Sequence, residues 1–141
     1  MYSPTTNLLY IRTKQSIITQ TICKYTYGTL VYHGHVRRVI AYLLYQNHRS
    51  THVQSHISKQ FLKINKLIPL YIDKHLILFP VKHQRAAIQY YVNACEIIGI
   101  SIVDQQTCIH FSNRTQLFVD DPPARIEKKW KECVAMHTYH P

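Results

Sequence analysis

The sequence predicts an α+β fold in which strands come first, two central amphipathic helices follow, and an antiparallel strand meander leads to a C-terminal helix. Three patterns predict this order. Residues 8–32 are rich in β-branched and aromatic side chains, the hydrophobic period becomes helical between residues 35 and 65, and short strand-like runs return after Pro69. A chain of 141 residues that is 46% hydrophobic has the size of one domain, so we expect a single domain over residues 1–141.

The first strands are predicted from the segment 8–32. Ile, Thr, Tyr and Val recur there with polar residues between them, as in the run Ser16–Tyr25. Such side chains fit a pleated, half-buried surface. The segment is long enough for two or three strands.

Two amphipathic helices are predicted next. The first spans His35–Gln46, because one apolar face is formed by Val36, Val39, Ile40, Leu43 and Leu44. The second runs from His52 to Asn65, with Ser50 or Thr51 as its N-cap. We expect its core side to consist of Val53, Ile57, Phe61 and Ile64.

The later half predicts a strand meander and a last helix. Short apolar runs occur at Leu70–Ile72 and Leu76–Phe79. Ile88–Ile97 alternates loosely, and Ile98, Ile100 and Ile102 then alternate with their neighbours. The segments Thr107–Phe111 and Thr115–Val119 flank a turn. Asp121, followed by two prolines, is typical of a helix start. The expected apolar face of that helix is Ile126, Trp130, Cys133 and Val134.

Charge divides the chain into two halves. Residues 1–72 contain no Asp or Glu and nine Lys or Arg, whereas residues 73–141 contain eight basic and seven acidic residues. The net charge of +10 therefore lies almost wholly in the N-terminal basic half. A one-sided field of this kind favours a polyanionic partner, and double-stranded DNA is the partner that we expect.

A basic stripe marks the second predicted helix. Its members recur at spacings of 3 and 4 residues, which keeps them on one helical sector: Arg49, His52, His56, Lys59, Lys63 and Lys66. Arg37, Arg38, Lys82 and Arg85 extend the predicted nucleic-acid-binding set. The alternative is an ordinary solvated helix face, although such a face normally mixes charges of both signs.

Metal and catalytic sites have weaker support. Cys108 with His110 and Cys133 with His137 have spacings that permit a zinc site, but buried cysteines and surface histidines explain them as well. No catalytic residues, cofactor or enzymatic activity are predicted. A small metal-dependent nuclease remains as an alternative, and it would need carboxylates that cluster in space.

The cellular setting is expected to be the cytoplasm. No apolar run approaches the length of a membrane span, and no secretory signal is recognisable at the N-terminus. The four cysteines are widely spread, which is typical of reduced thiols rather than of a disulfide scaffold.

Four segments follow one another in a recognisable order and spacing: Leu67–Ile72, Leu78–Val81, Gln89–Asn93 and Phe111–Arg114. They resemble the Lys-x-Pro-Ile-like strand, the Leu-Phe-Pro-Thr segment, the Cys-x-Trp stretch and the Phe-x-Asn-Gly turn of the bacterial competence transcription factor family ComK. The similarity covers roughly residues 20–119. Glycines between the two helices and the longer family tail have no counterpart, so the chain resembles a divergent or shortened member.

The resemblance implies a transcription activator of competence genes that binds A/T-rich duplex DNA as a multimer through the minor groove. Transcription machinery is then a further partner. Arg37, Arg38 and Arg49 are our candidates for insertion, because cations favour narrow A-tract grooves. Lys59, Lys63 and Lys66 are candidates for phosphate contacts. The alternative is a degenerate regulatory protein that modulates a full-length competence factor without binding DNA.

Overall fold

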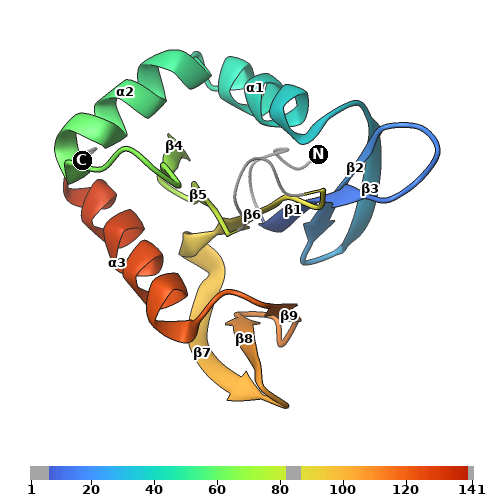
Figure 1. Cartoon of the computed structure of the whole chain (residues 1–141). Coiled ribbons are helices and arrows are strands. Elements are labelled where there is room, and N and C mark those ends of the chain that lie inside the picture. The colour runs from blue at the N-terminus through green and yellow to red at the C-terminus, as the bar shows by residue number, and fades with distance from the viewer. Residues whose placement is uncertain (1–6, 82–86, 140–141) are drawn as a thin grey trace.

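A computed structural model describes residues 7–81 and 87–139, with side chains through His137. It has the predicted α+β fold, and the order of strands, helices, strands and final helix is confirmed (Figure 1). The elements are β1 Leu8–Lys14, β2 Gln20–Tyr25, β3 Gly28–His33, α1 Val36–Gln46, α2 Thr51–Leu62, β4 Leu70–Asp73, β5 Leu76–Pro80, β6 Tyr90–Asn93, a 3₁₀ turn Ala94–Glu96, β7 Ile97–Val103, β8 Gln106–Phe111, β9 Gln116–Val119 and α3 Pro123–Tyr139.

The strands form two antiparallel sheets. The larger sheet has six strands in the order β3-β2-β1-β6-β5-β4, and the smaller has three in the order β7-β8-β9. β6 lies between β1 and β5, where Ile11 pairs with Tyr91 and Phe79 pairs with Val92. β6 therefore joins β1–β3, which belong to the basic half, to the β4–β5 hairpin, which spans the boundary between the two halves.

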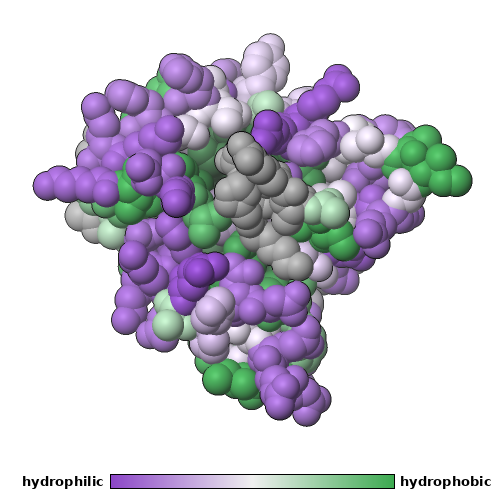
Figure 2. Space-filling model, in the orientation of Figure 1, coloured by the Kyte–Doolittle hydropathy of each residue, from purple (hydrophilic) through white to green (hydrophobic). Residues whose placement is uncertain are grey.

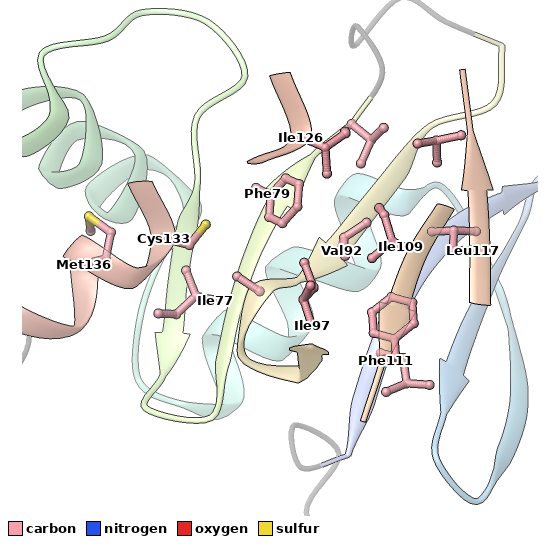
Figure 3. Packing of buried hydrophobic residues seen from close by; sticks show 14 of the residues in the cluster. Ile77, Phe79, Val92, Ile97, Ile109, Phe111, Leu117, Ile126, Cys133 and Met136 are labelled. Carbon is pink, nitrogen blue, oxygen red and sulfur yellow. The ribbon is translucent and has the colours of Figure 1, made fainter. Parts of the chain in front are cut away.

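Strands β4, β5 and β6 and the start of β1 are largely buried on both faces of the six-stranded sheet, whereas the edge strand β3 has only half-buried and exposed residues. On one face, α1 packs its five apolar residues against strand residues that include Leu8, Ile11 and Leu78. The predicted buried face of α1 is thus confirmed in full. On the other face, Leu9, Phe79 and Val92 meet the small sheet and α3. Figure 3 shows this second cluster, where Ile109, Phe111 and Leu117 face Val92, and Ile126 lies beside Phe79.

Asn93 connects several backbone segments at the end of β6. The side chain is fully buried. Its Nδ2 donates to the carbonyls of Leu8 at 2.8 Å and His75 at 3.0 Å, while its Oδ1 accepts from the amides of Ile77 at 3.2 Å and Cys95 at 3.1 Å. One amide therefore satisfies four backbone groups from four segments.

The prediction for α2 was wrong about the side that faces the core. Gln54 and Ser58 are buried, whereas Val53 and Phe61 are 51% and 37% exposed. The buried positions are one residue later than expected, so the helix is turned by about 100° from the predicted orientation. With its amide oriented to suit its neighbours, Gln54 donates to the Tyr71 carbonyl and accepts from Arg49, each at 3.2 Å. These hydrogen bonds make a polar core side acceptable.

The last helix differs from its prediction in a similar way. Ile126 and Cys133 are buried as expected, and Trp130 is half-buried against the core, but Val134 is 56% exposed. Met136 and the largely buried Lys129 complete the packed side instead. A lysine can take such a position because its ammonium group has partners, which are described below.

Candidate nucleic-acid interface

Seven of the predicted basic residues lie on α1, on α2 or in the turn after α2, and Arg49 lies just before α2. Arg37 and Arg38 are exposed in the first turn of α1, and the Nδ1 atom of the N-cap residue His35 accepts from the Arg37 amide at 3.2 Å. α2 carries His52, His56 and Lys59, all exposed. Seven of the eight predicted contact residues within the described ranges are exposed.

The predicted stripe does not continue along one helix. α2 ends at Leu62, and Lys63 is its C-cap with a left-handed backbone (φ 56°). Lys66 lies beyond the helix, in a turn that also holds Leu67 at φ 50°. The backbone therefore turns away after Lys63, and Lys66 is carried by this turn rather than by the helical stripe.

Arg49 has a structural role that the sequence did not indicate. It precedes the N-cap Ser50, and its Nε donates to the Ile72 carbonyl at 3.0 Å. The guanidinium also lies 5.1 Å from the centre of the Tyr71 ring. These contacts attach the start of α2 to β4. Arg49 is half-buried and engaged in these contacts, and its insertion into DNA stays a prediction.

All seven Asp and Glu residues lie outside α1, α2 and the turn after α2. Among the described residues, ion pairs join Lys129 with Glu132, Lys131 with Glu127 and Arg125 with Asp121, all on α3 or just before it. No described carboxylate lies within salt-bridge distance of Lys59 or Lys66. The positive charge of α2 and its following turn is therefore not neutralised by the later half within the described ranges.

A cavity of about 830 Å³ lies between α1, α2, the turn after α2 and the start of α3. Four cationic side chains line it: Arg37, Lys59, Lys66 and Arg125. Three of these were predicted as contact residues. Arg125 was missed, because it lies in the charge-balanced half and nothing in its local spacing relates it to Lys59.

The surface in Figure 2 agrees with this distribution. Hydrophilic side chains gather over α2 and the neighbouring part of α3, interrupted by small hydrophobic areas. A separate hydrophobic tip lies over the loop between β1 and β2, where Ile17 and Ile18 are exposed. The basic elements and this apolar tip are therefore on different parts of the molecule.

The four weak zinc candidates do not converge. Cys108 is buried on β8, His110 Nε2 lies 2.7 Å from Ser101 Oγ, and Cys133 is in the hydrophobic cluster. His137 Nε2 lies 3.6 Å from Cys95 Sγ instead. Within residues 7–81 and 87–137, no three His, Cys, Asp or Glu side chains are grouped so that they could hold a metal ion.

Two predicted contact residues, Lys82 and Arg85, lie outside the described residues.

None of the helices in the described part of the chain is long and apolar enough to span a membrane. No protein-family model matches the chain, and no curated protein or solved structure matches it either.

Proposed function

We propose that this chain is a cytoplasmic, multimeric DNA-binding protein that activates transcription of competence genes and recognises A/T-rich duplex through the minor groove. The observation that carries the proposal is the exposed cationic surface of α1, α2 and the following turn. The resemblance of residues 20–119 to the competence transcription factors supports the same function.

Electrostatics explains how this surface would act. Lys59, Lys63 and Lys66 can each displace condensed counterions from a phosphate backbone, which makes binding favourable and dependent on salt. Arg38 projects from the first turn of α1 and is exposed, so it is the arginine best suited to enter a narrow groove. Exposed His52 and His56 line the same side of α2 as Lys59.

A matched pair of charge reversals tests the proposal. Lys59→Glu with Lys63→Glu removes two cations from the proposed interface. Lys128→Glu with Arg114→Glu removes two exposed cations from α3 and the β8–β9 turn. Both variants change the net charge equally. Binding to a fluorescent A/T-rich duplex would be measured by anisotropy over a series of salt concentrations.

The interface variant is expected to lose at least tenfold in affinity at low salt and to show a shallower dependence on salt. The control variant should lose much less. Equal losses would assign binding to net charge alone. A wild-type protein that fails to bind duplex at low salt would refute the proposed function.

One observation favours a second candidate, a regulatory interaction protein. The outer side of α2 exposes Val53 and Phe61, and Tyr45 near the end of α1 is 76% exposed. Such apolar positions on a helix surface can serve protein contacts. Folded protein that does not bind duplex, yet forms a complex with a full-length competence factor, would favour this candidate. Val53→Ser with Phe61→Ser should then weaken that complex and leave folding intact.

A further inference from the structure

The floor of the cationic cavity is apolar. Ile40, Leu70, Val81 and Tyr91 line it, and each is at most 6% exposed. They belong to the two hydrophobic clusters that hold the six-stranded sheet. The floor is therefore fixed by the packing of the core, and a ligand that enters does not need to order it.

The walls are polar and positive. Thr51 and Ser55 contribute side chains from α2, and Asn65 contributes one from the following turn. Burial raises the pKa of the Tyr91 hydroxyl, and the positive charge of nearby Arg37 opposes part of this rise. The phenol thus stays protonated at neutral pH, where it can donate a hydrogen bond.

The four cations come from both halves of the chain. Arg37 belongs to α1, Lys59 to α2, Lys66 to the turn and Arg125 to α3. Arg125 has a carboxylate near it, since Asp121 Oδ2 lies 3.8 Å from its Nη1 atom, but its side chain remains 56% exposed. That distance is long for a charge-assisted hydrogen bond, so the guanidinium retains donors for a ligand.

We infer that this cavity binds a nucleotide unit, with its phosphate against Arg37, Lys59, Lys66 and Arg125 and its sugar or base against the apolar floor. Cations alone would accept any anion. The apolar floor favours an organic group attached to the phosphate, and the cavity volume is within the range of about 300–1,000 Å³ that is usual for small-molecule sites. The nucleotide has two sources: a free nucleotide, or a residue of the bound duplex, in which case the inference rests on the proposed function.

Two variants isolate the cavity. Arg125→Gln removes the one cation that lies outside the basic half, and Ser55→Phe fills the cavity without changing its charge. Arg114→Gln is the control, because Arg114 is an exposed cation in the β8–β9 turn. Urea unfolding establishes that each variant is folded. Calorimetry would then measure binding of deoxyadenosine monophosphate and of inorganic phosphate, and anisotropy would measure binding of the A/T-rich duplex.

The nucleotide is expected to bind at least tenfold more tightly than phosphate and to lose about fivefold or more in Arg125→Gln and in Ser55→Phe, since one charged contact is worth about 1 kcal/mol or more. If both variants also lose affinity for the duplex, or lose affinity for the duplex alone, the ligand is a nucleotide of the bound strand. If only the monophosphate responds, the ligand is a free nucleotide.

Two results would overturn the inference. The first is that Arg125→Gln and Ser55→Phe lose no more affinity, for either the monophosphate or the duplex, than the control Arg114→Gln does. The second is that deoxyadenosine monophosphate binds no more tightly than inorganic phosphate, while the affinity for the duplex is unchanged in Arg125→Gln and in Ser55→Phe. Duplex binding that survives either result would leave the proposed function standing. Nucleotide binding without duplex binding would remove the proposed function and keep the inference.

Discussion

Single polar residues hold much of this fold, and Asn93 is the clearest example. Its amide is surrounded by backbone groups from β1, the β4–β5 turn, β5 and the 3₁₀ turn. The sequence predicts Asn93 only as part of a strand-like run and of a segment that resembles the competence factors, and it predicts no structural role, because the partners of the side chain lie up to 85 residues away. Only the folded chain shows what the side chain contacts.

Asn93→Leu is expected to lower the free energy of unfolding by about 3–5 kcal/mol, since two donors and two acceptors lose their partner in the core. Urea denaturation at neutral pH would measure the change. Asn113→Leu is the control, because Asn113 is exposed in the β8–β9 turn and makes one hydrogen bond to the Thr115 amide. A loss below about 1 kcal/mol for Asn93→Leu would contradict this account.

Cys23 predicts a loss of stability at alkaline pH. Burial raises the pKa of its thiol to about 12. The unfolded thiol, with a pKa of about 8.5, ionises first, so stability is fully present below about pH 8.5 and falls as the pH rises toward 12. Between pH 8 and pH 10.5, the free energy of unfolding should fall by about 2–3 kcal/mol less in Cys23→Ala than in the wild-type protein. Urea midpoints across this range would test it, and parallel declines in both proteins would argue against it. Tyr25 also contributes to the decline in both proteins, because its pKa is raised by burial first and by the neighbouring Cys23 next.

At the scale of elements, the two helices of the basic half show when periodicity is sufficient. The apolar set of α1 fits only one helical face, and its prediction was confirmed. In α2, Val53, Ile57 and Phe61 recur every four residues, which also indicates a face, yet the helix buries Gln54 and Ser58. The hydrogen bonds of Gln54 to Tyr71 and Arg49 decide the orientation, and no local pattern shows them.

Burying the hydroxyl of Ser58 on the side of α2 that faces the core lowers the stability of the fold, and substitution by alanine should remove this loss. Ser58 is fully buried, and its Oγ has no hydrogen-bond partner among the described residues. Ser58→Ala is therefore expected to raise the free energy of unfolding by about 0.5–2 kcal/mol, through desolvation and helix propensity. Ser55→Ala, on the same helix but half-buried, should gain only the propensity part. Thermal unfolding of both variants would compare them, and destabilisation by Ser58→Ala would count against the proposed packing.

The turn after α2 depends on α3 for its position. Lys129 Nζ donates to the Lys66 carbonyl at 3.3 Å and pairs with Glu132 Oε1 at 2.9 Å, in a largely buried setting. This contact fixes the backbone that carries Lys66 at the cavity. Lys129 is thus a positioning residue for the proposed interface, and it does not itself need to touch a ligand.

A pair of double variants separates positioning from charge. Lys129→Met with Glu132→Leu removes the tether, while Lys131→Met with Glu127→Leu removes an exposed ion pair from the same helix. Net charge is the same in both. We expect the first to lower duplex affinity by about threefold to tenfold and to speed hydrogen exchange near residues 64–67, because the turn loses its anchor. Similar affinity and exchange in the two variants would argue that the tether has no such role.

For the whole molecule, composition predicted a cationic surface but not all of the residues that form it. The absence of acids from residues 1–72 indicated a cationic region, and seven described residues of the predicted set are exposed there. The order of the strands in the sheet could not be predicted from the sequence, because the pairing of β6 with β1 and β5 depends on contacts between distant segments. Arg125 was missed for the same reason, since only the fold brings α3 beside α2.

The net charge of +10 also predicts a salt effect on the free protein. Like charges repel one another in the compact state, and salt screens that repulsion. The thermal midpoint is therefore expected to rise by a few degrees between 20 mM and 200 mM sodium chloride, while affinity for duplex falls over the same range. Differential scanning fluorimetry would measure the first effect. A midpoint that falls with salt would mean that attractive pairs dominate the surface.

The central place of β6 has a consequence for synthesis on the ribosome. Until that strand emerges from the exit tunnel, β1 and β5 each lack a neighbour along one edge. Until then the nascent chain, which already contains the whole basic half, has an incomplete sheet beside the ribosome's own polyanionic RNA. Neither half is expected to fold when expressed alone, and the protein acquires its native state only after its second half has been translated.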